Sequence, residues 1–397
     1  MMEIEATAAE MKEDPALIVK LLDSILIYGY NENASDIHLE PRENRMSVRI
    51  RIDGLLTEVL SLEKELHLPL IARAKIISGM DIAEKRLPQD GHIHEEIGGV
   101  EMDLRSSTIP TIYGEKAVLR FLNRDVPIDW ADTFGMNAEN YRKVLDILKR
   151  PNGIFYITGP TGSGKTTTLY MILERLLTAP VNIVTIEDPV EKNIDGISQM
   201  QVNKQAGLTF ETGLRAALRQ DPDIIMIGET RDGVTARTSV RAAITGHLVL
   251  STLHTNDAVS AVVRMLDMGV EPYLAADSLS GILSQRLVRK ICPKCAEETV
   301  PDEEEQKLLG PGIPKIRRGR GCSFCRNTGY KGRIAVHEVF IVDREIRKMI
   351  AKGSPVEEIR EYAKEIQKLR PLKDDILELV KQGVTTVDEF VRLTYGE

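Results

Sequence analysis

Long apolar runs, aromatic residues and cysteines are all scarce in this sequence. Its 397 residues include 4 cysteines and only 5% aromatic residues. No run of about 18 apolar residues occurs, so we expect no direct membrane span. The amino terminus, Met1-Met2-Glu3-Ile4-Glu5, is acidic and lacks the basic and then apolar profile of a signal peptide. The sequence therefore predicts a cytoplasmic protein that reaches a membrane only through a partner.

The chain also lacks a surplus of basic residues. It has 52 Lys and Arg against 60 Asp and Glu, which gives a formal net charge of −8. Nucleic-acid binders usually carry a strongly basic surface, so this balance argues against a DNA or RNA partner. The rest of the composition is that of a globular protein, and the length predicts roughly two or three domains.

The four cysteines form two C-x-x-C pairs, Cys292 with Cys295 and Cys322 with Cys325. In a cytoplasmic protein this pattern favours a metal over disulfides. Four thiolates suit a tetrahedral Zn²⁺ with a structural role. A redox dithiol is the alternative interpretation.

A glycine-rich stretch between an apolar run and a helical pattern indicates a nucleotide site. Residues 159–166 fit G-x-x-x-x-G-K-[ST], after a strand-like run at 154–158. Backbone N–H groups of such a loop cradle phosphates, Lys165 reaches the β- and γ-phosphates, and the Thr166 hydroxyl binds Mg²⁺. A glycine-rich turn with a solvated lysine is the alternative. The predicted ATP-binding residues are Gly159, Pro160, Thr161, Gly162, Ser163, Gly164, Lys165, Thr166 and Thr167.

Periodicity divides the chain into parts. The sequence predicts an α/β fold: a RecA-like P-loop ATPase domain, preceded by a small α+β domain and followed by a tetracysteine zinc module and a helical C-terminal segment. Buried parallel strands are expected at 181–186, 224–227 and 248–252, and a helix at 15–30. The predicted domain boundaries are 1–122, a linker at 123–133, and then 134–290, 291–333 and 334–397.

Hydrolysis of a phosphoanhydride needs a group that orients water and cations that stabilise the transition state. Glu229 follows the apolar run 224–227 and is the candidate base; a solvated glutamate is the alternative. Glu187 and Asp188 follow another apolar run and are expected to act on Mg²⁺ through water. His247 and His254 flank the run 248–252, where a histidine could read the γ-phosphate, bridge a subunit or be structural.

Two further groups are interpreted as solvated side chains. His92 and His94 alternate on a strand-like run, but no third metal ligand lies nearby in the sequence. The basic run 315–320 is interpreted as a solvated face of the cysteine module, with a docking patch as the alternative.

Together, these motifs resemble those of the secretion ATPase superfamily, specifically the assembly ATPases of type II secretion and type IV pili (the GspE/PilB group). The resemblance rests on the stretches 35–41 and 49–54, the P-loop, the acidic box 185–191, the run 218–223 that leads to Gly228-Glu229, the histidine box 245–256 and the four cysteines.

The resemblance implies a homohexameric ring motor that binds an inner-membrane platform protein and drives pilin or pseudopilin polymerisation. It implies that Arg105 and Arg120 reach the phosphates when domains close, that Glu229 is the catalytic glutamate, and that 134–136 lies near the adenine. Family members usually carry a further N-terminal domain, so a truncated or naturally short chain is expected. Thr230 departs from the isoleucine or methionine that is usual there.

Two other classes share the P-loop. A nucleic-acid motor would need DNA-stimulated hydrolysis, and a small-molecule kinase would need an acceptor site in one compact domain.

Overall fold

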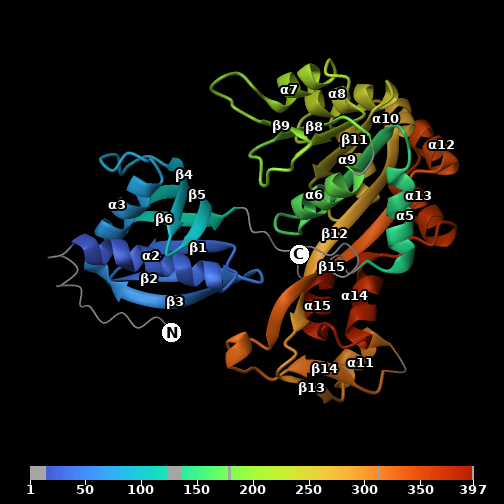
Figure 1. Ribbon diagram of the computed structural model, residues 1–397. Coiled ribbons are helices and arrows are strands. Elements are labelled where there is room, and N and C mark those ends of the chain that lie inside the picture. The colour runs from blue at the N-terminus through green and yellow to red at the C-terminus, as the bar shows by residue number, and fades with distance from the viewer. Residues whose placement is uncertain (1–14, 123–135, 178–179, 311–312, 396–397) are drawn as a thin grey trace. The chain divides into compact units, whose positions relative to one another are not determined.

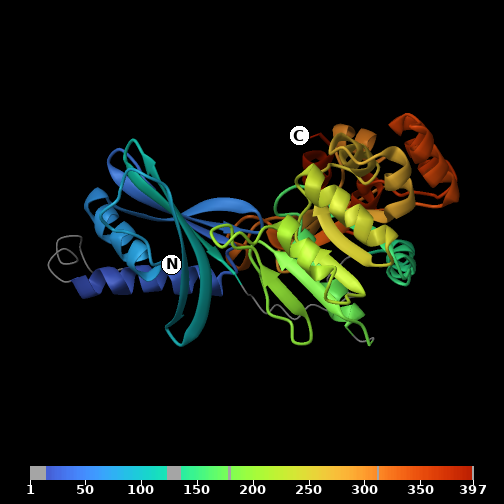
Figure 2. The ribbon, with the colours of Figure 1, turned by 90° about the horizontal axis from the view of Figure 1, so that it is seen from above.

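The computed structural model describes residues 15–122, 136–177, 180–310 and 313–395. The chain divides into two compact units, Met1–Val126 and Pro127–Glu397. The helices and strands of each unit are drawn in Figures 1 and 2. The predicted linker at 123–133 and the first two residues of the predicted adenine contact lie outside the described residues.

Within residues 15–122, the first unit is a six-stranded antiparallel sheet with the α-helices α2 and α3. Strand order is β3-β2-β1-β6-β5-β4. The apolar faces of both helices and of the strands share one core. Met46, Val48 and Ile50, which alternate along β2, lie in this core. The elements are α2 (Pro15–Asn31), β1 (Asp36–Pro41), β2 (Arg45–Ile52), β3 (Leu55–Glu63), η1 (Lys64–Leu66), α3 (His67–Ile77), β4 (Gln89–Ile97), β5 (Val100–Thr111) and β6 (Gly114–Phe121).

The second unit is built on a seven-stranded sheet of order β15-β12-β7-β11-β10-β8-β9. Neighbouring strands are parallel except for the antiparallel pair β12 and β15. The strands are β7 (Gly153–Thr158), β8 (Ile183–Glu187), β9 (Ser198–Gln201), β10 (Ile224–Ile227), β11 (Leu248–Leu253), β12 (Leu279–Ile291) and β15 (Tyr330–Ile341).

Helices cover both faces of this sheet, which explains why the central strands β7, β8, β10 and β11 are buried along their whole length. In β7, Ile154 and Tyr156 enter one core, whereas Phe155 and Ile157 enter the other. The helices are α5 (Ala138–Leu148), α6 (Lys165–Leu176), α7 (Phe210–Ala217), α8 (Gly233–Ile244), α9 (Ser260–Asp267), α10 (Pro272–Ser278), α12 (Arg344–Lys352) and α13 (Val356–Glu365). The α/β fold is confirmed.

The cysteine-containing segment leaves this sheet after β12 and returns to it as β15. It contains the two-stranded sheet of β13 (Ala296–Thr299) and β14 (Ile316–Gly319), with α11 (Glu303–Leu309) and the short helix η2 (Ser323–Cys325). The final helices, α14 (Leu372–Lys381) and α15 (Val387–Tyr395), share an apolar cluster with this segment.

Residues 334–341, at the start of the predicted helical subdomain 334–397, belong to β15, which pairs with β12 along most of its length. The helices of this subdomain begin at Arg344. None of the helices in the described parts of the chain combines the length and apolar character that crossing a bilayer requires.

Candidate nucleotide site and metal centre

The P-loop connects β7 to α6, as the sequence predicted. Gly162 and Gly164 have φ values of 78° and 85°, a left-handed conformation that glycine adopts without strain. The amine of Lys165 donates hydrogen bonds to the carbonyl oxygens of Gly159 at 2.8 Å and Pro160 at 2.9 Å. Thr166, in the first turn of α6, is exposed, so its hydroxyl is available to a ligand.

The surroundings of Lys165 destabilise the protonated form of its amine. Burial lowers its pKa to about 8; the Glu229 carboxylate opposes the shift, and the Arg286 guanidinium adds to it. A phosphate would favour the charged form of this lysine. Ligand binding is therefore expected to be linked to its protonation.

Glu229 and His254 lie at the same edge of the sheet as the P-loop. The parallel strands β7, β11 and β10 are adjacent, so the residues that follow them meet at their carboxyl ends. Glu229 Oε2 lies 2.5 Å from Arg231 Nε and 3.8 Å from His254 Nε2. Burial and the nearby Lys165 lower the pKa of His254, despite the opposing Glu229 carboxylate. The site therefore combines a cation, a carboxylate and a mainly neutral histidine.

The buried Glu187 has both carboxylate oxygens engaged in hydrogen bonds. One accepts a hydrogen bond from the Tyr170 hydroxyl, and the other accepts from Thr185 Oγ1 at 2.5 Å and Gln199 Nε2 at 3.1 Å. Tyr170 is on α6, so the carboxylate ties β8 to the helix that follows the P-loop. A role toward Mg²⁺ stays a prediction.

The structure does not bring His247 to this site. It precedes β11, and its carbonyl oxygen accepts a hydrogen bond from the N–H of Gly153, the first residue of β7. The P-loop follows the other end of β7, a strand of 6 residues. At about 3.3 Å per residue, His247 is roughly 20 Å from the loop along the strand direction. Of the two histidines that flank the strand 248–252, only His254, at the carboxyl flank, therefore reaches the site.

Arg105 and Arg120 lie in the first unit, on neighbouring strands, as direct cross-strand partners. Both side chains are exposed, and Arg120 Nε donates to Asp36 Oδ1 at 2.7 Å. Their predicted approach to the phosphates is untested. His92 and His94, in the same unit, are exposed and lie near Asp103 and Glu101.

Two residues that the sequence interpretation missed flank the P-loop. Gln285 and Arg286 lie on β12, which runs beside β7. Gln285 is 2% exposed and bonds to the loop, and Arg286 is 7% exposed. No local motif marks them, because a pairing between residues more than one hundred positions apart brings them to the loop.

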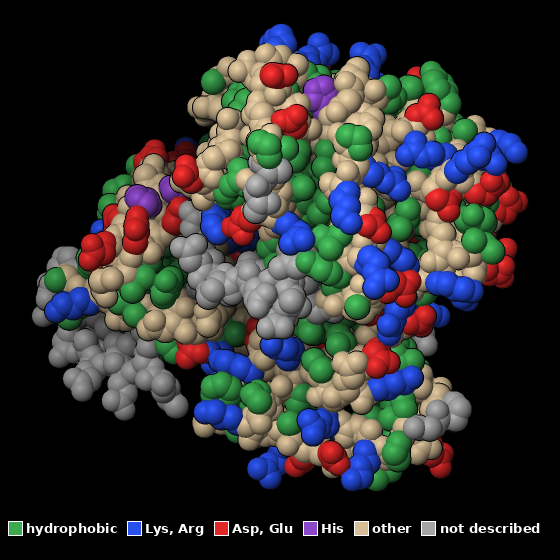
Figure 3. Space-filling view, turned by 45° about the vertical axis from the view of Figure 1, so that its right-hand side comes forward, with side chains coloured by type: hydrophobic (Ala, Val, Ile, Leu, Met, Phe, Trp, Pro, Cys, Tyr) green, Lys and Arg blue, Asp and Glu red, His purple; other side chains and the backbone are tan. Residues whose placement is uncertain are grey.

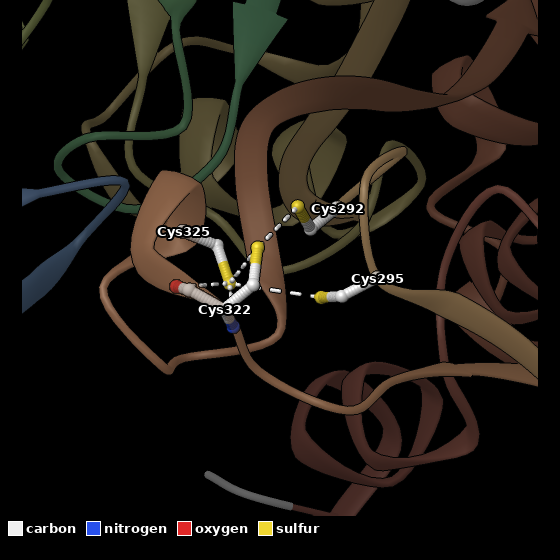
Figure 4. A group of neighbouring side chains, drawn as sticks. All are labelled: Cys292, Cys295, Cys322 and Cys325. Carbon is white, nitrogen blue, oxygen red and sulfur yellow. Dashed lines mark hydrogen bonds between the residues drawn. The ribbon is translucent and has the colours of Figure 1, made fainter.

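The four cysteine sulfurs come together in one cluster (Figure 4). The Sγ atoms are 3.9 Å apart for Cys292 and Cys322, 3.7 Å for Cys295 and Cys325, and 3.7 Å for Cys322 and Cys325. Four sulfurs around Zn²⁺ at about 2.3 Å would be roughly 3.8 Å apart, whereas a disulfide needs about 2.05 Å. The donor set fits a tetrahedral zinc ion.

Backbone N–H groups surround the same sulfurs. Gly321 donates to Cys295 Sγ at 3.3 Å, and Cys322 and Gly329 donate to Cys325 Sγ at 3.2 and 3.3 Å. Such bonds stabilise thiolates, the form that binds a metal.

Ion pairs engage much of the basic run at 315–320. Lys315 and Arg317 pair with Glu298, and Arg318 pairs with Glu305. These carboxylates neutralise part of the run, which favours the solvated face over a docking patch.

The chain matches known proteins over nearly its whole length. The family model described as "Type II/IV secretion system protein" matches residues 11–392. "Type IV pilus assembly ATPase PilB" of Thermus thermophilus is 46% identical over 395 residues, which are 98% of this chain and 44% of that protein. "Type II secretion system protein E" of Pseudomonas aeruginosa is 47% identical over 390 residues, 97% of this chain and 77% of that protein. The chain therefore spans less than half of the Thermus relative.

Solved structures agree on the fold. A crystal structure of the pilus retraction motor PilT with bound ADP has a TM-score of 0.65 and 27% identity, and covers 94% of this chain and 96% of that one. The ATPase DotB of Legionella pneumophila has a TM-score of 0.68 and covers 100% of this chain and 98% of that one, but at 21% identity it supports the fold alone.

Proposed function

Because the chain belongs to the family of type II/IV secretion system proteins, we propose that it is a motor ATPase that hydrolyses ATP to power type IV pilus assembly or type II protein secretion. The observation that carries the proposal is the edge where the P-loop, Glu229 and His254 meet. A phosphate cradle beside a carboxylate is the arrangement that hydrolysis of a nucleoside triphosphate needs.

Each residue of the site has a separate task in this proposal. The loop N–H groups and Lys165 bind the β- and γ-phosphates. The Thr166 hydroxyl holds Mg²⁺, which neutralises phosphate charge. Glu229 orients the attacking water and accepts its proton, while Arg231 holds the carboxylate in place.

Charge from the first unit completes the site. Arg105 and Arg120 approach the phosphates of the same or a neighbouring subunit, within a homohexamer. A guanidinium that arrives only on closure couples hydrolysis to domain movement. The motor acts in the cytoplasm, recruited to the inner membrane by a platform protein, and drives pilin or pseudopilin polymerisation. Zn²⁺ on the four cysteines has a structural role.

The test compares the purified chain with Glu229→Gln, which removes the base but keeps the size of the side chain. We expect the parent to hydrolyse ATP only with Mg²⁺, at a rate that rises as hexamers form; light scattering measures the oligomeric state. Glu229→Gln should abolish this hydrolysis. If Glu229→Gln hydrolyses ATP as fast as the parent, Glu229 is not the catalytic base.

DNA is added in a parallel reaction, because a nucleic-acid motor is the competing class. On the face shown in Figure 3, basic and acidic side chains are interspersed without one continuous basic field. Strong stimulation of hydrolysis by DNA would favour that class over a pilus or secretion motor.

A further inference from the structure

Gln285 connects the P-loop to the neighbouring strand β12. The parallel pairing of β12 with β7 ends at Ser284 opposite Thr158, so the next residue of β12 stands level with the start of the loop. The amide of Gln285 donates from Nε2 to the carbonyl oxygen of Ser163 at 2.8 Å. Its Oε1 accepts a hydrogen bond from Thr168 Oγ1, on α6, at 2.7 Å.

These two bonds fix the orientation of the amide. A carbonyl oxygen can only accept, so the NH₂ group of Gln285 must face Ser163. The Thr168 hydroxyl donates to the other end of the amide and thereby keeps it from rotating. The side chain is 2% exposed, so water does not replace either partner.

The same strand leaves no room for a side chain at two glycines of the loop. A Cβ at Gly159 would lie 2.4 Å from the carbonyl oxygen of Gln285, and one at Gly164 would lie 2.8 Å from its Nε2. The back of the loop therefore rests directly on Gln285.

The position of this amide matters because the backbone of a phosphate-binding loop has an N–H side and a carbonyl side. The N–H groups must face the anion, so carbonyl groups turn toward the protein. Each buried carbonyl group there needs a hydrogen-bond donor. Gln285 is that donor for Ser163. Without it, the loop would satisfy this carbonyl only by turning it toward water, and that rotation moves the adjacent N–H groups.

We propose that Gln285 is a positioning residue of the nucleotide site, whose amide holds the carbonyl side of loop 159–164 against β12 so that the N–H side faces the phosphates. This inference rests on the proposed nucleotide binding. It assigns Gln285 no contact with the substrate; it acts through Ser163 and is itself oriented by Thr168.

Calorimetric titration of the full chain with ADP tests the proposal. Gln285→Leu removes both bonds at similar volume and is expected to weaken ADP binding about tenfold. Thr168→Val removes the bond that orients the amide, together with the longer 3.2 Å bond from Thr168 Oγ1 to the carbonyl oxygen of Gly164, but keeps the bond from Gln285 to Ser163. It should weaken binding less, whereas Thr168→Ser keeps the hydroxyl and should bind like the parent.

The matched control is Thr385→Val. It removes an equally short hydrogen bond to the same strand, from Thr385 Oγ1 to the carbonyl oxygen of Arg289 at 2.7 Å, far along β12 from the loop. This variant should lower the melting temperature and leave ADP affinity unchanged. An equal loss of affinity in Thr385→Val and Gln285→Leu would mean that the loss follows general destabilisation.

The remaining outcomes separate this proposal from the proposed function. If the parent binds ADP and Gln285→Leu binds it within about twofold, the positioning role is wrong while nucleotide binding stands. If the parent binds neither ADP nor ATP, the proposed function fails first. If Gln285→Leu does not fold, the Thr168 pair decides, and equal affinity of Thr168→Val and Thr168→Ser would overturn the inference.

Discussion

Nucleotide affinity should fall as the pH rises from 7 to 9, because Lys165 loses its proton in this range. Burial, with a smaller contribution from Arg286 and against the attraction of Glu229, lowers the pKa of this lysine to about 8. The charged fraction of the free protein is then about 0.9 at pH 7 and about 0.1 at pH 9. An ordinary lysine, with a pKa near 10.4, would stay charged across this range.

The magnitude follows from this change in charge. Bound phosphate favours the protonated amine, so the complex keeps the proton that the free protein has lost. ADP affinity should therefore fall about tenfold from pH 7 to pH 9, and binding at pH 9 should take up about 0.9 proton. The phosphates themselves contribute little, because their second pKa is about 6.

Calorimetry in buffers of different ionisation enthalpy measures both the affinity and the proton uptake. Lys165→Arg is the control, because a guanidinium stays charged at pH 9. That variant should bind more weakly at pH 7 but show no decline toward pH 9. If the ADP affinity of the parent changes less than about twofold from pH 7 to pH 9, and binding at pH 9 takes up no proton, then Lys165 does not lose its proton in this range and the prediction is wrong.

Two predictions concern stability. Lys75→Met leaves the Glu115 carboxylate buried without its cation, in a pair whose side chains are 1% and 6% exposed. It should destabilise the first unit by about 3–5 kcal/mol, seen as faster hydrogen exchange in β5 and β6. Lys75→Met with Glu115→Gln should recover much of this loss, and an unrecovered loss would contradict the charge argument. Purified protein should hold one zinc ion per chain, and its removal by a chelator should raise exchange in β13 and β14 while β7 and β11 stay protected. A folded, metal-free chain with the same protection in β13 and β14 would contradict the structural role.

Local signals were enough to predict the P-loop and the central strands. The glycine pattern, the apolar run 154–158 and the helical pattern after it are neighbours in sequence, and the structure places them as β7, loop and α6. The run 224–227 coincides with β10 for the same reason. The cysteine spacing predicted one cluster, because each pair sits on a tight turn.

The features that the sequence did not predict depend on strand pairing between residues far apart in the chain. Gln285 reaches the loop only because β12 lies beside β7, and no periodic signal predicts that neighbour. Residues 334–341 join the seven-stranded sheet through β12, a partner that precedes the whole cysteine module, and no local signal gives that pairing. His247 shows a different kind of error: the run 248–252 was expected to be a parallel strand, and only the carboxyl flank of such a strand lies at the phosphate edge of the sheet.

The ends of the cysteine module lie side by side, which makes it an insertion into a β-hairpin. Ile291 pairs with Tyr330, and the N–H of Cys292 donates to the carbonyl oxygen of Gly329 at 2.9 Å. A two-residue turn between Ile291 and Tyr330 would therefore close the hairpin and leave the seven-stranded sheet intact. Such a shortened chain would uncover apolar side chains of α14 and α15, including Ile376 and Phe390, which share a cluster with Leu309 and Ile316 of the module. Removal of the module and polar substitutions on these two helices would thus have to occur together, in an engineered chain as in evolution.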